Sequence, residues 1–393
     1  MRILLLGEYS NVHWTLAEGL RELGHDVTVV SDGDNWKNYR RDINLKRHSL
    51  GFAGTARYMF DVVRTLPKLK GYDIVQIINP MFLSLKAEKM YPFYKYVRKN
   101  NGKLFMGAFG MDYYWVKAGM DCKTFRYSDF NIGDRQRTGG ENALFIRDWL
   151  YGVKGELNRR VAEDCDGIIS GLYEYDVCYR PYYADKLRFI PFPINMGSIE
   201  PIKHDGHKTV RFFIGIQKLR SEYKGTDIML KALERLKAKY PDECEIVKVE
   251  SVPFDTYKTL MDSSDAILDQ LYSYTPAMNA LLAMAKGLIL VGGGEEENYS
   301  ILGETELRPI INVLPNEYDV FRKLEWLVQN KNLIPKLSEE SVEYIRRHHD
   351  HVKVAKQYVD FWNSCPRKNR ATATTIKSML YAKKSETHQS STA

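Results

Sequence analysis

The first thirty residues, MRILLLGEYSNVHWTLAEGLRELGHDVTVV (1–30), decide the fold class of this chain. The apolar run Ile3–Leu6, which stops at a glycine, predicts a buried parallel strand. Leucines recur at helical spacing within Leu16–Gly24, and the closing glycine ends that helix. Val27–Val30 predicts a second strand. A strand, a helix and a strand in this order indicate the first unit of a doubly wound sheet.

The same alternation continues through the chain in two series. The first series has further predicted strands at 72–78, 103–106, 167–170 and 187–190, and the two prolines of 191–195 end its regular structure. The second series has predicted strands at 210–214, 245–249, 266–268 and 288–291, and predicted helices at 226–239, 254–261 and 278–286. We therefore expect an α/β fold of two Rossmann-like, doubly wound domains, 1–195 and 196–340.

Three segments depart from this alternation. Trp115–Trp149 is aromatic, polar and aperiodic, which predicts a long inserted loop with a functional role. One apolar stripe between Val342 and Trp362 predicts a single helix over 341–365 that closes the fold. Residues 366–393 are polar and predict a disordered tail, with a short basic amphipathic membrane contact at 379–384 as the alternative.

The composition is that of an ordinary globular protein. Of its 393 residues, 44% are hydrophobic and 27% are charged, which excludes a disordered or fibrous class. Five cysteines without a C-x-x-C pair favour reduced thiols in a cytoplasmic protein over a disulfide framework or a structural zinc site. No stretch approaches the ~20 apolar residues of a membrane span, and the first residues lack the longer apolar core of a signal peptide.

The net charge of +7, from 57 Lys and Arg against 50 Asp and Glu, leaves two interpretations open. The excess is basic surface spread over a long chain, or it attracts polyanions such as phosphorylated substrates or an anionic membrane face. No recognised nucleic-acid motif is present, so no nucleic-acid partner is expected.

The segment Gly215–Asp227, GIQKLRSEYKGTD, is the clearest candidate binding site. A predicted strand ends there and a helix begins, so free backbone N–H groups and the positive end of the helix dipole attract phosphate. Arg220 can hold a diphosphate through two parallel hydrogen bonds, Lys224 adds a point charge, and Gly225 allows close approach. An exposed basic loop that binds nothing is the alternative interpretation.

Lys224-Gly-Thr-Asp227 resembles the K-G-x-D segment of GT-B glycosyltransferases, particularly the large family-4-like group. Further stretches resemble motifs of that group in the same order over residues 1–330: Leu20–Val27 (L-x-x-x-G-H-x-V), Ile190–Asn195 (I-P-N-G-I-D), Asp265–Leu268 (A-D-I) and Ala283–Gly287 (E-A-M-A-x-G). The resemblance implies GT-B architecture, in which two Rossmann-like domains face a cleft. It also implies that the first domain presents the acceptor and the second binds a nucleotide diphosphate sugar.

The resemblance further implies which residues contact the donor. Arg220 and Lys224 would hold the donor diphosphate and neutralise the leaving group, with Lys218 as the alternative to the arginine. Gly7 would lie against the donor phosphates across the cleft. The implied reaction is a metal-independent transfer of a hexosyl group, with no cofactor besides the nucleotide-sugar co-substrate.

The chain departs from the pattern of that group at positions that concern catalysis. The positions of the group's two glutamates are occupied by Tyr274 and Leu282. The histidine of its H-G-x-D segment is replaced by Phe109. The ribose contact, the sugar contact and the retaining mechanism of the group are therefore not carried over to this chain.

Other polar residues are candidates for these roles. Asp112 is a candidate for binding sugar hydroxyls or acting as a base, and His13 for a base on the acceptor side, while a helix cap and a surface-loop histidine are the alternatives. Asp269, Glu295 and Glu296 follow predicted strands and are candidates for the donor ribose or sugar, with a solvated acidic loop as the alternative for the last two.

Two other polar stretches are not expected to bind a metal. Asp32-Gly-Asp34 follows a predicted strand, where turns favour these residues. His348–His351 lacks a closed set of ligands and is interpreted as an exposed polar helix face.

The expected function is transfer of a sugar from a nucleotide diphosphate sugar to a cell-envelope glycan or a lipid-linked acceptor. The expected location is the cytoplasm of a bacterium, and contact with the inner face of the membrane stays open. Two alternatives remain: a non-catalytic glycosyltransferase-like binding protein, suggested by the replaced glutamates and histidine, and a GT-B nucleotide-sugar epimerase.

Overall fold

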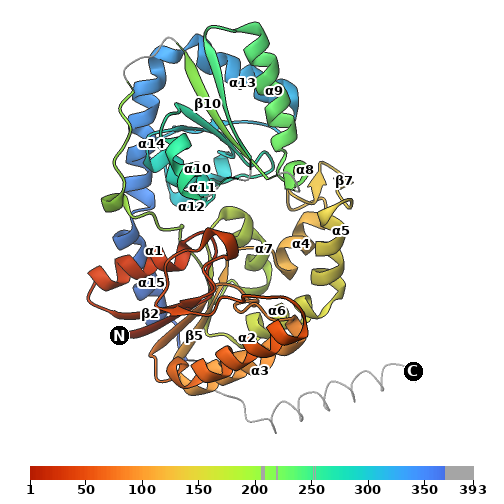
Figure 1. Ribbon diagram of the computed structural model, residues 1–393, viewed down its shortest axis with the longest axis vertical. Coiled ribbons are helices and arrows are strands. Elements are labelled where there is room, and N and C mark those ends of the chain that lie inside the picture. Colours follow the sequence, from red (N-terminus) through yellow and green to blue (C-terminus); the bar gives the residue numbers. More distant parts are fainter. Residues whose placement is uncertain (205–208, 218–219, 251, 253, 368–393) are drawn as a thin grey trace.

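The computed structural model describes residues 1–204, 209–217, 220–250, 252 and 254–367, and its two large sheets form the centres of two lobes (Figure 1). Both sheets are parallel, so consecutive strands are joined by crossover helices that cover the sheet faces. The two Rossmann-like domains predicted from the sequence are thereby confirmed. The boundaries 195/196 and 340/341 stay predictions.

The N-terminal sheet has the strand order β3-β2-β1-β4-β5-β8-β9. Its order reverses between β1 and β4, so a crevice opens beyond the carboxyl ends of these two strands. The strands are β1 (Arg2–Leu6), β2 (Asp26–Ser31), β3 (Ile43–Asn44), β4 (Ile74–Ile77), β5 (Lys103–Ala108), β8 (Gly167–Ser170) and β9 (Leu187–Phe189).

The C-terminal sheet has the strand order β11-β10-β12-β13-β14. Its order reverses between β10 and β12, and open α/β sheets bind ligands beyond the carboxyl ends of strands at such a point. The strands are β10 (Val210–Ile216), β11 (Cys244–Glu250), β12 (Ala266–Asp269), β13 (Ile289–Gly292) and β14 (Ile311–Asn312).

Helices connect the strands of both lobes and enclose their apolar cores. Those of the N-terminal lobe are α1 (Val12–Glu22), α2 (Gly51–Thr65), α3 (Ala87–Asn100), α4 (Tyr113–Met120), α5 (Glu141–Phe145), α6 (Val153–Asp164) and α7 (Tyr173–Tyr183). Those of the C-terminal lobe are α8 (Ser221–Lys224), α9 (Thr226–Lys239), α10 (Phe254–Met261), α11 (Met278–Ala285), α12 (Glu296–Leu302) and α13 (Glu317–Gln329). No helix within the described residues is long and apolar enough to cross a membrane.

The chain ends in two helices rather than the single predicted helix. α14 (Ile334–His348) packs on the C-terminal lobe against α11, and α15 (His351–Ser364) packs on the N-terminal lobe against α1 (Figure 1). The helix breaks at Asp350, whose side chain caps α15. The backbones of His349 and His351, on either side of Asp350, form hydrogen bonds with the backbone of Ile194. The apolar stripe continues through the break, which is why the sequence predicted one helix. Of the predicted tail, residues 368–393 lie outside the described residues.

The inserted segment is not the long loop that its aperiodic sequence predicted. It contains α4, the hairpin β6 (Asn131–Ile132) and β7 (Arg135–Gln136), α5, and a π-helical turn at Ile146–Tyr151. These elements are too short to show a periodic pattern in sequence. In Figure 1 the hairpin lies beside α8, where the two lobes meet.

Candidate functional site

The predicted diphosphate segment lies at the point where the C-terminal sheet reverses its order. β10 ends at Ile216, and after the short α8 the chain enters α9 through Gly225, which has a φ of 73°. A Cβ on this glycine would lie 2.6 Å from Cβ of Leu271, so both the backbone angle and the space require glycine. The first amides of an α-helix have no partner within the helix, and α9 begins at Thr226, beyond the carboxyl end of β10. Lys218 lies outside the described residues.

Two cations of this segment come together beside an acidic residue. Arg220 and Lys224 interact electrostatically with each other, and Lys224 also interacts with Asp269 at the end of β12. Burial lowers the pKa of Lys224, as do the neighbouring cations, whereas Asp269 opposes the shift. The pKa of Asp269 is raised by its own burial and lowered by Lys224. A phosphate group at this point would therefore offset a local crowding of positive charge.

The N-terminal lobe contributes a third cation that the sequence did not reveal. Lys37 interacts electrostatically with Lys224 across the lobes. Its ammonium donates to Asp34 at 2.6 Å and to Ser10 at 3.2 Å, so it is held at the edge of the N-terminal crevice. Only the tertiary structure brings this residue to the segment around Arg220. The charge of Lys37, held by Asp34, therefore acts on Lys224 of the opposite lobe.

The inserted segment covers the diphosphate segment from the other side. Nε of Arg220 donates to Oε2 of Glu141 on α5 at 3.2 Å. The Tyr223 hydroxyl of α8 donates to Asp129 at 2.6 Å. Arg137 donates to the carbonyl of Glu222, and its guanidinium carbon lies 3.8 Å from the centre of a tyrosine ring. The segment is thus a contact between the lobes that already engages the guanidinium of Arg220.

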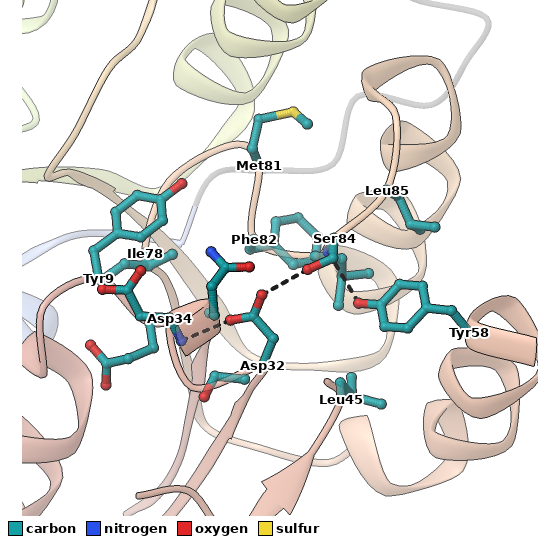
Figure 2. A pocket seen from close by; sticks show the side chains of 15 residues that line it. Tyr9, Asp32, Asp34, Leu45, Tyr58, Ile78, Met81, Phe82, Ser84 and Leu85 are labelled. Carbon is teal, nitrogen blue, oxygen red and sulfur yellow. Dashed lines mark hydrogen bonds between the residues drawn. The ribbon is translucent and has the colours of Figure 1, made fainter. Parts of the chain in front are cut away.

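A cavity of about 250 Å³ lies where the N-terminal sheet reverses its order (Figure 2). Asp32 lies in its wall and accepts a hydrogen bond from the Ser84 hydroxyl at 2.7 Å, and its other oxygen accepts from the amide of Asp34 at 3.0 Å. Asp32-Gly-Asp34 is therefore a turn, as predicted, but it also lines a cavity. Beyond it, an outer pocket of about 370 Å³ shares Asp32, Asn35 and Ser84 with the first.

Glu8 also lines this cavity, and the sequence analysis did not single it out. Its carboxylate accepts the backbone N–H groups of His13 and Trp14 at the start of α1, at 3.2 and 2.9 Å. Burial raises the pKa of Glu8 to about 8, although both N–H groups favour the charged form. Burial therefore favours the protonated form of this side chain.

The predicted catalytic residues, Asp112 and His13, are both fully buried and neither lines the cavity. Asp112 caps α4 by accepting the amide of Trp115 at 2.8 Å, and its other oxygen accepts from the Tyr179 hydroxyl at 2.7 Å. Burial raises the pKa of Asp112 to about 6 and lowers that of His13 to about 3. Nδ1 of His13 lies 2.8 Å from the carbonyl oxygen of Gly7. Their catalytic roles stay predictions.

Gly7 ends β1 at the same crevice, with a φ of 83°. A Cβ there would lie 2.3 Å from Cγ2 of Ile78, so glycine allows the close packing of two strand ends. It lines the N-terminal cavity, and its contact with donor phosphates stays a prediction.

Glu295 and Glu296 occupy different surroundings. Glu295 lies between the lobes, where it accepts from the Tyr127 hydroxyl at 2.5 Å and pairs with Arg126 at 2.9 Å. Glu296 is exposed and pairs with Arg308 at 2.9 Å. Of the three residues predicted to contact donor ribose or sugar, Asp269 interacts electrostatically with Lys224, whereas Glu295 and Glu296 pair with arginines.

Two of the three positions at which the chain departs from the resembled group, Tyr274 and Phe109, have clear structural contacts. The Tyr274 hydroxyl accepts the amide of Arg126 at 2.8 Å, and the Tyr274 amide donates to Glu174 at 2.7 Å, so this residue joins the lobes. Phe109 packs edge-on against Phe192 with ring centres 5.3 Å apart. Residues that face a ligand in the resembled group are thus part of the lobe contact or of the core here.

The described residues contain no group of His, Cys, Asp and Glu side chains that could hold a metal ion. The expectation of an exposed histidine face is wrong, because His349 and His351 are buried. Nδ1 of His349 lies 2.8 Å from the Phe192 carbonyl oxygen, and Nε2 of His351 lies 2.9 Å from Glu22. These histidines join the end of the chain to the N-terminal lobe.

Comparison with solved structures identifies the architecture. Sucrose-phosphate synthase from Thermosynechococcus elongatus is similar over 92% of this chain and 98% of its own, with a TM-score of 0.60 at 11% identity. The Anabaena protein HepE, solved with UDP and glucose, is similar over 93% and 100%, with a TM-score of 0.59 at 10% identity. This chain has the GT-B fold.

A third structure agrees with the GT-B fold over part of its length. The S. aureus protein TarM, solved with fondaparinux, alpha-GlcNAc-glycerol and UDP, is similar over 78% of this chain and 59% of its own, with a TM-score of 0.53 at 12% identity. The chain matches no protein-family model and no curated protein sequence. The similarity is therefore one of architecture, and the function has to be argued from the site.

Proposed function

We propose that this chain transfers a sugar from a nucleoside diphosphate sugar to an acceptor hydroxyl. The observation that carries the proposal is that Arg220 and Lys37, the latter from the opposite lobe, both act electrostatically on the buried Lys224, just before the start of α9. Arg220, Lys224 and the start of α9 follow β10, at the point where the C-terminal sheet reverses its order, and open α/β sheets bind ligands at such points. Cations and a helix N-terminus are the groups that stabilise a leaving diphosphate.

The donor is proposed to be a UDP-sugar. HepE, which shares the fold over almost the whole chain, was solved with UDP-glucose. Arg220, Lys224 and Gly225 are proposed to hold the diphosphate, and Asp269 a ribose or sugar hydroxyl. The cations are proposed to supply the charge compensation without a metal ion, so an excess of EDTA should leave the rate of transfer unchanged. Loss of activity that Mg²⁺ restores would contradict this part.

The acceptor is proposed to enter the N-terminal cavity. Asp32 and Glu8 line it, and carboxylate oxygens accept hydrogen bonds from sugar hydroxyls. A general base works best when its pKa lies near the working pH, and burial brings the pKa of Glu8 to about 8. Glu8 is therefore proposed, in place of His13 and Asp112, to receive the proton of the attacking hydroxyl.

The acceptor class and location are proposals of the same kind. The acceptor is proposed to be a cell-envelope glycan or a lipid-linked sugar that also contacts Lys46 and Arg47 of the outer pocket. The enzyme is proposed to act in the bacterial cytoplasm, at the inner face of the membrane.

The test combines donor binding with product formation. UDP-, GDP-, ADP- and CMP-sugars are screened by thermal shift, since a ligand that binds the folded state raises the melting temperature. Arg220→Ala with Lys224→Ala should abolish the shift caused by the preferred donor. Lys231→Ala with Arg235→Ala, on the exposed part of α9, is the matched control and should leave it unchanged.

Two outcomes would overturn the proposal. If the donor raises the melting temperature of both double variants equally, the donor does not bind at this segment. Isomerisation of the sugar without any acceptor would identify an epimerase instead. Transfer to a lysate-derived acceptor by the purified chain supports the transferase.

A further inference from the structure

The helix α2 has an apolar face that no part of the described chain covers. Its residues Gly54, Tyr58 and Val62 are buried against the N-terminal lobe. On the opposite side, Phe52 is 92%, Phe60 64% and Val63 50% exposed, and Leu50 just before the helix is 86% exposed. A surface helix normally has one apolar face, which packs on the core. α2 has a second, and large exposed apolar faces mark interaction sites.

The surroundings of this face are strongly basic. The stretch 46–70 contains six Lys and Arg residues and a single acidic residue, Asp61. Arg57, Arg64, Lys68 and Lys70 are exposed, and Lys46 and Arg47 are partly exposed. An apolar helix face bordered by Lys and Arg is the pattern of helices that lie in the interface of an anionic bilayer. The charge thus favours a negatively charged lipid surface over a neutral protein partner.

The segment before α2 is fixed to the helix, so that both present one surface. Nη2 of Arg47 donates to Oγ1 of Thr55 at 2.6 Å, and Nε donates to the carbonyl of Ser49 at 3.1 Å. Gly54 packs so closely that a Cβ would lie 2.3 Å from the Ser49 carbonyl oxygen. Leu50 and Phe52 are therefore held together rather than on a separate loop.

The same segment lines the outer pocket of the N-terminal lobe. Lys46, Arg47, His48, Ser49 and Leu50 form one side of this pocket, which continues into the cavity around Asp32. In Figure 1 α2 lies on the part of this lobe away from the C-terminal lobe, so a flat surface can reach it without meeting the second sheet.

We propose that α2 and residues 46–50 dock the N-terminal lobe on an anionic lipid bilayer. The apolar side chains enter the interface and the basic ones bind lipid headgroups, so the outer pocket opens at the membrane surface. An acceptor carried by a lipid would then reach the cavity without leaving the bilayer. This last step rests on the proposed function, whereas docking itself does not.

The experiment measures binding of the full chain to vesicles, with neither nucleotide nor acceptor present. Vesicles of phosphatidylcholine alone are compared with vesicles that also contain phosphatidylglycerol. Phe52→Ser with Phe60→Ser tests the apolar face, and Arg57→Gln with Arg64→Gln tests the charge. Tyr151→Ser with Tyr318→Ser is the control, since these exposed aromatic residues lie outside α2. Melting temperatures verify that all variants fold.

We expect binding to the anionic vesicles that is at least tenfold tighter than to the neutral ones. The arginine variant should lose about fivefold per side chain, the phenylalanine variant at least tenfold, and the control nothing. Wild-type-like binding by the folded phenylalanine variant would overturn the proposal, as would absence of binding by the wild type. If the wild type is a dimer and the phenylalanine variant is a monomer, the face binds a second copy of the chain instead.

The failure of this proposal is distinguishable from failure of the proposed function. If UDP-sugar binding is absent but vesicle binding follows the expected order, the transferase proposal fails and docking stands. If vesicles are not bound but soluble acceptors are glycosylated, docking fails alone.

Discussion

Glu141 is predicted to compete with a diphosphate for Arg220. The two side chains are joined at 3.2 Å and are 35% and 38% exposed. An ion pair at this exposure contributes about 0.2–1 kcal/mol. A diphosphate that takes over the guanidinium has to break this pair first. Glu141→Gln should therefore tighten binding of the preferred UDP-sugar by a factor of about 1.5–5.

Arg220→Ala should act in the opposite direction and more strongly. Hydrogen bonds to charged groups contribute about 1.5–3 kcal/mol, which corresponds to an affinity about 10–150-fold weaker. In the double variant, Glu141→Gln should have no further effect, because its benefit comes from releasing the arginine.

Calorimetry with the four proteins measures this cycle. Arg211→Ala is the matched control, since it breaks an arginine–glutamate pair of similar exposure at the other end of β10. Equal tightening by Glu141→Gln with and without Arg220 would refute the competition. Unchanged affinity in Arg220→Ala would refute the binding site itself.

Three further predictions concern stability in urea. Burial raises the pKa of Glu8 from 4.5 to about 8, so stability should fall as pH rises between these values by about 1.4 kcal/mol per unit; Glu8→Gln should remove this slope, and a wild-type slope would contradict it. Burial lowers the pKa of His349 from 6.5 to about 4, so stability should fall as pH drops below 6.5, by about 2 kcal/mol at pH 5. His349→Gln should flatten this loss and the exposed His48→Gln should not; equal profiles would disprove the assignment. Gly225→Ala should lower the free energy of unfolding by more than about 1–2 kcal/mol, and by more than Gly303→Ala, where φ is also positive but the space is open; equal losses would mean that contact with Leu271 costs nothing.

The sequence predicted the sheets well because their signals are local. Buried parallel strands are short apolar runs, and crossover helices carry apolar residues at helical spacing. The helices predicted over 226–239 and 254–261 have these bounds in the structure. The candidate diphosphate segment could be predicted for the same reason, since a strand end, a basic loop and a helix start are adjacent in the chain.

The remainder of the site depends on contacts between distant segments. Lys37 and Glu141 reach the segment around Arg220 only when the lobes meet, and nothing in their own neighbourhood indicates this. Glu8 is one carboxylate among many until folding buries it in a cavity wall. The break before α15 depends on pairing between Asp350 and Ile194, which are far apart in sequence.

Residues that look catalytic in sequence can also have structural contacts. Asp112 retains the aspartate of the resembled motif, yet it caps a helix and accepts a buried tyrosine hydroxyl. A short polar side chain at a strand end can cap the following helix or bind a ligand, and the sequence is the same in both cases. Burial and hydrogen-bond partners, which only the fold provides, separate the two uses.

A crystal structure of the chain with bound UDP tests the central claim most directly. The account predicts the diphosphate at the N-terminus of α9, within hydrogen-bonding distance of Arg220 and Lys224, with Arg220 released from Glu141. A diphosphate bound elsewhere, with Arg220 still paired to Glu141, would contradict it.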